Sequence, residues 1–154
     1  MDPVTIANEA TLIYDNITKN SNAVVTRILS LYDLTATKEA LLDSYTPGQT
    51  ITYITRVENT GSASLYNLTI VDDLANGTLQ YIDTSIEGYL NGSPIEIDVQ
   101  KTANTVTFKI DNVLNPNDNV LIIFETTTPT TNPEQITNTQ TITANGGSTT
   151  GPIV

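Results

Sequence analysis

The clearest alternation of apolar and polar residues along the chain lies at residues 104–110. Val106, Phe108 and Ile110 fall on one face of this segment, and threonine and lysine residues fall on the other. This period of two predicts a β-strand with one face in a core and one in water. Residues 120–125 are apolar on both faces, which indicates a central strand or one that a partner chain covers.

Turn-forming residues separate these strand-like runs at short intervals. They are Pro47-Gly48, Asn59-Thr60-Gly61, Asn76-Gly77, Asn91-Gly92, Asn115-Pro116-Asn117-Asp118 and Asn145-Gly146-Gly147. Between them the sequence is rich in valine, isoleucine and threonine, which favour strands. The pattern predicts an all-β fold, namely an immunoglobulin-like antiparallel β-sandwich with an additional N-terminal β-strand or hairpin segment.

One strand-like sequence occurs twice. Residues 6–12 read like residues 136–142, and a further strand-like run, residues 23–29, follows the first copy. After the second copy only a short tail remains, so we expect this copy to lack its closing hairpin partner. We therefore predict an N-terminal extension at residues 1–33 with candidate donor strands, a sandwich at 34–144 and a C-terminal tail at 145–154.

Composition and charge exclude several functions. The chain has 6 basic and 17 acidic residues, a net charge of −11, so we expect neither nucleic acid nor a membrane as partner. It has no cysteine and no histidine, which excludes cysteine nucleophiles, the Ser-His-Asp arrangement and the common zinc sites. We expect no cofactor and no enzymatic activity on other molecules. The first residues show no secretion signal, which indicates either that one was removed or that export is unconventional.

Five motifs lie between about Leu34 and Ala144. They are Thr37-Lys38, Pro47-Gly48-Gln49-Thr50-Ile51-Thr52-Tyr53, Val57-Glu58-Asn59-Thr60-Gly61, Leu68-Thr69-Ile70-Val71-Asp72-Asp73-Leu74 and Ile136-Thr137-Asn138-Thr139. Through these motifs, residues from about Leu34 to Ala144 resemble a family of surface repeats called domain of unknown function eleven, which occurs in tandem in prokaryotic cell-surface proteins. Thr55 and Ala75 depart from the family pattern, which has an apolar residue and proline there. In such arrays, residues 1–31 look like the end of a preceding module.

Strand parity singles out three polar residues. Lys38, Asp72 and Asn138 each share parity with apolar neighbours on their predicted strands, so all three side chains should point into the core. Burying an ammonium, a carboxylate and an amide costs several kcal/mol unless they satisfy one another. We therefore expect the three side chains to meet.

Such a cluster can form a covalent bond. A neutral Lys38 amine can attack the Asn138 carbonyl and expel ammonia, with Asp72 as a protonated acid that polarises the carbonyl and shuttles protons. The arrangement resembles the self-crosslinking sandwich domains of pilins and collagen-binding adhesins, which have the lysine in the first strand and the asparagine in the last. That resemblance implies an intramolecular isopeptide bond, and a hydrogen-bonded cluster without the bond remains the alternative.

Other site chemistries have less support in the sequence. Asp72, Asp73 and Asp118 are weak candidate Ca²⁺ ligands, but the chain lacks a full Asp-x-Asp-x-Asp-Gly loop, so we predict no metal site. Two carboxylates could serve a glycosidase, yet the chain has no tryptophan and only 2 phenylalanines to form a sugar platform.

The predicted fold gives a functional hypothesis. A sandwich without its closing strand can accept an extended segment from another molecule. We expect residues 1–31 to be the donor and the partner to be a second copy, in a head-to-tail homopolymer. This hypothesis predicts a structural subunit of an extracellular filament or pilus on a cell or spore surface. The alternative is a monomeric stalk module of a larger surface protein or an adhesin with an unknown ligand. The assembly residues would be Ile6, Asn8, Leu12, Val24, Val25 and Ile28.

Overall fold

A computed structural model describes residues 4–15, 17–21, 24–28, 31–131, 135–145 and 147–153. Within these ranges, side chains are not described at residues 4–7, 14, 24–28 and 147–153. The chain forms two compact units, Met1–Leu31 and Tyr32–Val154. Among the described residues, no helix has the length and apolar character that crossing a membrane requires.

The N-terminal unit is a two-stranded antiparallel ribbon made of two consecutive strand pairs. β1 (Val4–Asn8) pairs with β4 (Val24–Ile28), and β2 (Thr11–Tyr14) pairs with β3 (Ile17–Asn20). A ribbon of two strands buries little apolar surface and is marginally stable alone. Leu12, Ile13 and Ile17 are accordingly 67%, 71% and 58% exposed. We call residues 4–28 the N-terminal ribbon.

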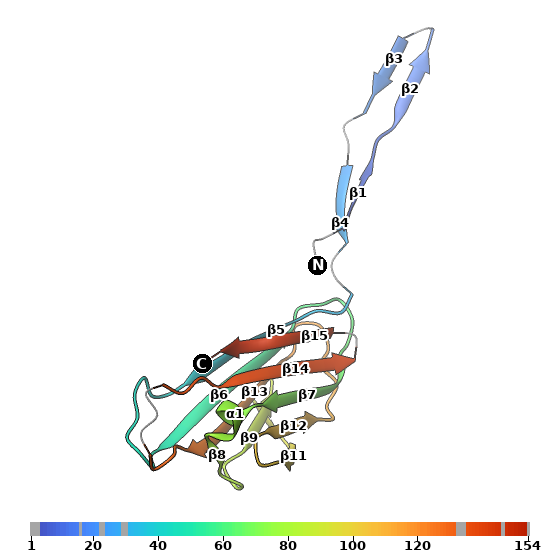
Figure 1. Ribbon diagram of the computed structural model, residues 1–154. Helices are drawn as coiled ribbons and strands as arrows, with labels where there is room; N and C mark the ends of the chain where they lie inside the picture. The colour runs from blue at the N-terminus through green and yellow to red at the C-terminus, as the bar shows by residue number, and fades with distance from the viewer. Residues whose placement is uncertain are drawn as a thin grey trace. The chain divides into compact units, whose positions relative to one another are not determined.

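The second unit is the predicted sandwich of two antiparallel sheets (Figure 1). The larger sheet has the order β10-β9-β13-β6-β5, and β8 also pairs with β13. Its strands are β5 (Leu34–Ala40), β6 (Thr50–Asn59), β8 (Gln80–Tyr81), β9 (Glu87–Leu90), β10 (Ser93–Ile95) and β13 (Asn119–Thr127).

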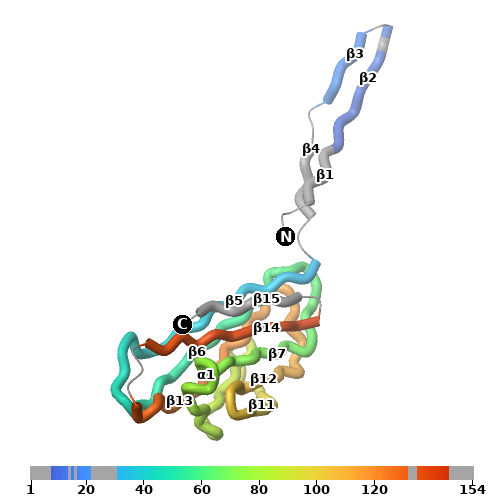
Figure 2. Tube along the Cα trace, viewed as in Figure 1, coloured from blue at the N-terminus to red at the C-terminus, as the bar shows by residue number. Residues whose placement is uncertain are grey.

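The smaller sheet has the order β11-β12-β7-β14-β15. Its strands are β7 (Tyr66–Asp72), β11 (Asp98–Lys101), β12 (Val106–Ile110), β14 (Thr139–Asn145) and β15 (Gly147–Ile153). The one-turn segment α1 (Leu74–Gly77) follows β7 directly (Figure 2). β15 also runs beside β5, so the edges of the two sheets meet there.

The core lies between the two sheets and follows the predicted alternation. Val106, Phe108 and Ile110 are fully buried on β12, which confirms the period of two in that strand. β13 pairs with β6 on one side and with β8 and β9 on the other, which confirms that residues 120–125 lie in a central strand. Phe108 and Phe124 meet across the core with ring centroids 5.0 Å apart.

The C-terminal residues differ from the prediction of a short tail without a hairpin partner for the preceding strand. Residues 147–153 form β15, which pairs with β14 and closes the sheet. Gly147, Gly151 and Pro152 are poor strand formers, so propensity alone disfavours a strand here. The free edge of β14 nevertheless offers backbone hydrogen bonds that outweigh this preference. The expectation that β14 lacks its hairpin partner is therefore wrong.

Candidate crosslinking site

Lys38, Asp72 and Asn138 come together from both sheets. Lys38 lies in β5 of the larger sheet, whereas Asp72 ends β7 and Asn138 immediately precedes β14 in the smaller sheet. Lys38 is 5% exposed, and Asp72 and Asn138 are fully buried. Strand parity thus predicted the correct direction for all three side chains.

One carboxylate oxygen lies between the lysine and the asparagine amide. Lys38 Nζ is 2.9 Å from Asp72 Oδ2 and donates to the main-chain oxygen of Asn138 at 3.2 Å. Asn138 Nδ2 donates to the same Asp72 Oδ2 at 3.4 Å. The amine and the amide nitrogen therefore share Asp72 Oδ2, which can exchange protons with both.

The carbonyl end of the Asn138 side chain points to a backbone donor. Ala75 N donates to Asn138 Oδ1 at 3.1 Å. A backbone N–H can face only an acceptor, so this contact fixes the amide with its oxygen at Ala75 and its nitrogen at Asp72. Asp72 was expected to polarise this carbonyl, but the Ala75 N–H occupies that position instead.

The Ala75 donor depends on an unusual backbone turn. Leu74, Ala75 and Asn76 have φ values of 47°, 52° and 56°, and Gly77 has 81°. Left-handed conformations cost non-glycine residues roughly 1–2 kcal/mol each, so this turn is strained. Proline has φ near −65° and no N–H, so it could neither adopt this conformation nor donate to Asn138. This geometry therefore excludes proline at position 75.

Burial tunes the two ionisable side chains beside the asparagine. Desolvation lowers the pKa of Lys38, although Asp72 and Asp73 act in the opposite direction. Burial also raises the pKa of Tyr53 to about 12, so this residue stays a neutral phenol. Lys38 Nζ lies 4.8 Å from the centre of the Tyr53 ring. The surroundings therefore favour the neutral, nucleophilic amine more than water does.

Two further buried polar residues belong to this cluster and were missed in the sequence. Gln140 Nε2 donates to Asp72 Oδ2 at 3.0 Å, and Thr55 Oγ1 donates to Gln140 Oε1 at 3.0 Å. Gln140 shares strand parity with Asn138, so strand parity also predicts that its side chain points into the core. Thr55 stands where domain of unknown function eleven usually has an apolar residue. The hydrogen bond from its hydroxyl to Gln140 explains the polar side chain at this position.

The candidate Ca²⁺ ligands have other partners. Asp73 accepts from Ala75 N, Thr139 N and Thr139 Oγ1, which ties α1 to the start of β14. Asp118 accepts from Asn115 N at 2.8 Å within its own turn and from Asn91 Nδ2 at 2.7 Å in the turn between β9 and β10. Among the residues described, His, Cys, Asp and Glu side chains form no group of three or more that could hold a metal ion.

The candidate assembly residues all lie in the N-terminal ribbon. Ile6 belongs to β1, and Val24, Val25 and Ile28 belong to β4, but their side chains fall outside the described ones. Asn8 and Leu12 are exposed at the end of β1 and in β2.

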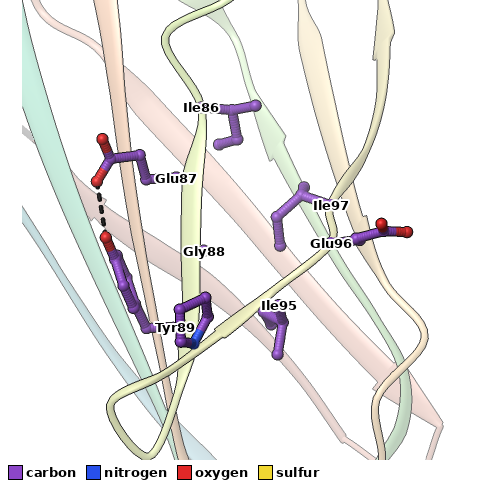
Figure 3. Close-up of a pocket in the computed structure, with 8 residues that line it drawn as sticks. Ile86, Glu87, Gly88, Tyr89, Ile95, Glu96 and Ile97 are labelled. Carbon is purple, nitrogen blue, oxygen red and sulfur yellow. Dashed lines mark hydrogen bonds between the residues drawn. The ribbon is translucent and has the colours of Figure 1, made fainter.

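A shallow groove crosses β9 and β10 on the larger sheet (Figure 3). Gly88 lines the groove. A Cβ atom at this position would lie 2.6 Å from Ile97 Cδ1, so a larger side chain would displace Ile97. Tyr89 donates to Glu87 at 2.9 Å, so these polar groups on the wall bond to each other. Isoleucine and proline side chains form much of the remaining lining. Glu96 is the other charged residue of the lining.

Solved structures share this fold. The chain is similar to the pilus backbone protein RrgB of Streptococcus pneumoniae, with 13% identity and a TM-score of 0.56 over 73% of this chain and 31% of that one. It is similar to BcpA, the major pilin subunit of Bacillus cereus, with 13% identity and a TM-score of 0.62 over 96% and 47%. A third similar structure is the C-terminal domain of the antigen I/II-family protein AspA of Streptococcus pyogenes, with 14% identity and a TM-score of 0.64 over 99% and 54%.

These similarities concern the fold. No family model matches the chain, and no curated protein matches it in sequence, so the resemblance to domain of unknown function eleven stays a prediction. The chain covers between 31% and 54% of the three solved chains. The antiparallel sandwich of this protein is thus one that occurs in bacterial pilins and in the N-terminal domain of an adhesin of Streptococcus gordonii.

Proposed function

We propose that the protein is a structural subunit of an extracellular fibre, and that an isopeptide bond between Lys38 and Asn138 holds its sandwich together. The observation that carries the proposal is the buried contact of Lys38 Nζ and Asn138 Nδ2 with one oxygen of Asp72. The occurrence of the fold in pilins and adhesins supports a place on the cell surface.

The bond forms by displacement of ammonia. The neutral Nζ of Lys38 attacks Cγ of Asn138, and Asp72 takes a proton from Nζ as the new bond forms. The Ala75 N–H stabilises the negative charge that develops on Oδ1, as an oxyanion hole does. Asp72 then passes this proton to Nδ2, the Cγ–Nδ2 bond breaks, and ammonia leaves. A neutral amine and a primary amide become a secondary amide and ammonia, without oxidation or reduction.

The bond connects the two sheets through one residue near the start of the sandwich sequence and one near its end. Lys38 and Asn138 are 100 residues apart, so the bond closes a long loop between the first strand and the last hairpin. Pulling the chain at its two ends then loads the covalent bond before it separates β5 from β14. A fibre that bears tension needs this property.

Assembly would use the N-terminal ribbon. Because β14 already has β7 and β15 as neighbours, a donated single strand has no vacant position beside it. The ribbon supplies two strands, and it can replace the whole β14–β15 hairpin of a neighbouring copy before the Lys38–Asn138 bond of that copy forms. Exposed Leu12 and Ile13 give the ribbon an apolar surface that such a contact would bury.

A stalk module of a larger surface protein is the second candidate. It is favoured by the occupied position of β15, which lets each sandwich close on itself without a donor. In that case the sandwich is one domain in a series of domains of a single polypeptide.

Electron microscopy of the purified protein distinguishes these functions. The filament subunit forms fibres, and a variant that lacks residues 1–31 forms isolated particles. Isolated particles in both samples would exclude the filament and leave the stalk module.

A further inference from the structure

The N-terminal ribbon repeats the strand pairing of the β14–β15 hairpin. The inner pairs of both segments correspond one by one at a constant offset along the chain. In the ribbon they are Thr11↔Asn20, Leu12↔Lys19, Ile13↔Thr18 and Tyr14↔Ile17, and in the hairpin they are Thr141↔Thr150, Ile142↔Thr149, Thr143↔Ser148 and Ala144↔Gly147.

The outer pairs correspond as well, including an irregularity. In the hairpin the register shifts between Thr139 and Thr141, so that Thr139 pairs with Ile153. In the ribbon the register shifts by the same one residue between Asn8 and Thr11, so that Asn8 pairs with Val24. A bulge at the same position is a specific feature, because it sets the twist and aim of the flanking strands. The ribbon is therefore a backbone copy of the closing hairpin.

This correspondence pairs residues of known position in the sandwich with residues of the ribbon. Leu12 corresponds to Ile142, which is fully buried in the core, while Leu12 itself is 67% exposed. Asn8 corresponds to Asn138 at the same offset that relates the inner pairs, and both asparagines lie in the repeated sequence. The ribbon thus has the apolar residue and the amide that the hairpin site of a sandwich accepts.

We propose that Asn8 is a second isopeptide acceptor for Lys38, used between two copies of this chain. The ribbon of one copy occupies the hairpin site of the other, and Lys38 Nζ of the second copy bonds to Cγ of Asn8. The Cγ–Nδ2 bond of Asn8 breaks and ammonia leaves, with Asp72 moving the proton as before. This inference rests on the proposed crosslinking function of Lys38.

Two differences make Asn8 the slower acceptor. Ala10 replaces Gln140, so Asp72 Oδ2 loses the donor that holds it at 3.0 Å. Glu9 replaces Thr139, whose hydroxyl donates to Asp73 at 2.6 Å, so a carboxylate would face a carboxylate. Each Lys38 can form only one bond. The closed monomer and the linked chain therefore compete, and the monomer has the advantage.

Removal of the internal acceptor tests the proposal in the full chain. Asn138→Ala protein is refolded from denaturant at high concentration and examined by denaturing electrophoresis and peptide mass spectrometry. We expect a ladder of multimers that contain a Lys38–Asn8 peptide, each bond with the loss of one ammonia. The added change Glu9→Thr should raise the multimer yield several-fold, because it removes the like-charge contact. Asn8→Ala in the same background should abolish the ladder.

Three results would overturn the proposal. They are a linked peptide in the monomer band only, multimers without a Lys38–Asn8 peptide, and a ladder that survives Asn8→Ala. The unaltered protein serves as the control that separates this proposal from the function on which it rests. If it shows the Lys38–Asn138 bond while the variant forms no link, only the role of Asn8 fails. If it also lacks the internal bond, the proposed crosslinking function itself fails.

Discussion

The substitution Asn138→Ala measures the contribution of the isopeptide bond to stability. The bond closes a loop of 100 residues, and for a loop of this length the chain-entropy treatment of crosslinks gives about 4.7 kcal/mol. The noncovalent part of the loss is smaller. Asn138 Nδ2 makes one long hydrogen bond to Asp72, and the Ala75 N–H that bonds to Asn138 Oδ1 also donates to Asp73 at 2.9 Å.

The expected loss in free energy of unfolding is therefore about 5–6 kcal/mol, against about 1–2 kcal/mol for a cluster held by hydrogen bonds alone. The assay is guanidinium unfolding of dilute protein, so that links between copies do not form. Thr55→Val is the matched control, because it removes a hydrogen bond from the same cluster and leaves the crosslink in place. It should cost about 1 kcal/mol. A loss near 2 kcal/mol or below for Asn138→Ala would refute the covalent account.

Four further predictions follow from contacts of the described residues. Because burial lowers the pKa of Lys38, the crosslinking rate of freshly refolded protein, followed by mass spectrometry, should rise with pH and level off below the pH at which an ordinary lysine titrates. The same shift means that the unfolded chain binds this proton more tightly, so uncrosslinked Asn138→Ala protein should gain stability as pH rises through the folded pKa towards the unfolded one. Asn59→Ala should cost about 2–4 kcal/mol in denaturant unfolding, since Asn59 Nδ2 donates to Ala63 O and Leu114 O and its Oδ1 accepts from Gly61 N. Thr126→Val should raise the free energy of unfolding by on the order of 1 kcal/mol, because the buried Thr126 hydroxyl has no hydrogen-bond partner among the described residues. The melting temperature should therefore rise by a few degrees. An unchanged or lower melting temperature would contradict this last prediction.

Much of the sandwich could be predicted from local sequence. The alternation at Val106, Phe108 and Ile110 depends only on the period of a strand, and the structure buries all three side chains. The same parity argument placed Lys38, Asp72 and Asn138 in the core, because an inward position on a two-sided strand follows from its neighbours. Charge and length played no part in that inference.

The rest depended on contacts between distant segments. β15 forms because β14 offers an unpaired edge, which the propensities of Gly147 and Pro152 do not reveal. The left-handed turn at Leu74–Asn76 opposes the conformational preference of its residues, so the Ala75 donor could not be predicted. The role of Thr55 becomes clear only when Gln140 lies opposite it at 3.0 Å.

The accurate mass of the intact, denatured protein tests the central claim most directly. The account predicts a mass lower than that of the sequence by one ammonia, with fragmentation that places the link between Lys38 and Asn138. The unaltered sequence mass in freshly folded and in aged protein would contradict it, and would show that the buried cluster is held by hydrogen bonds and charge alone.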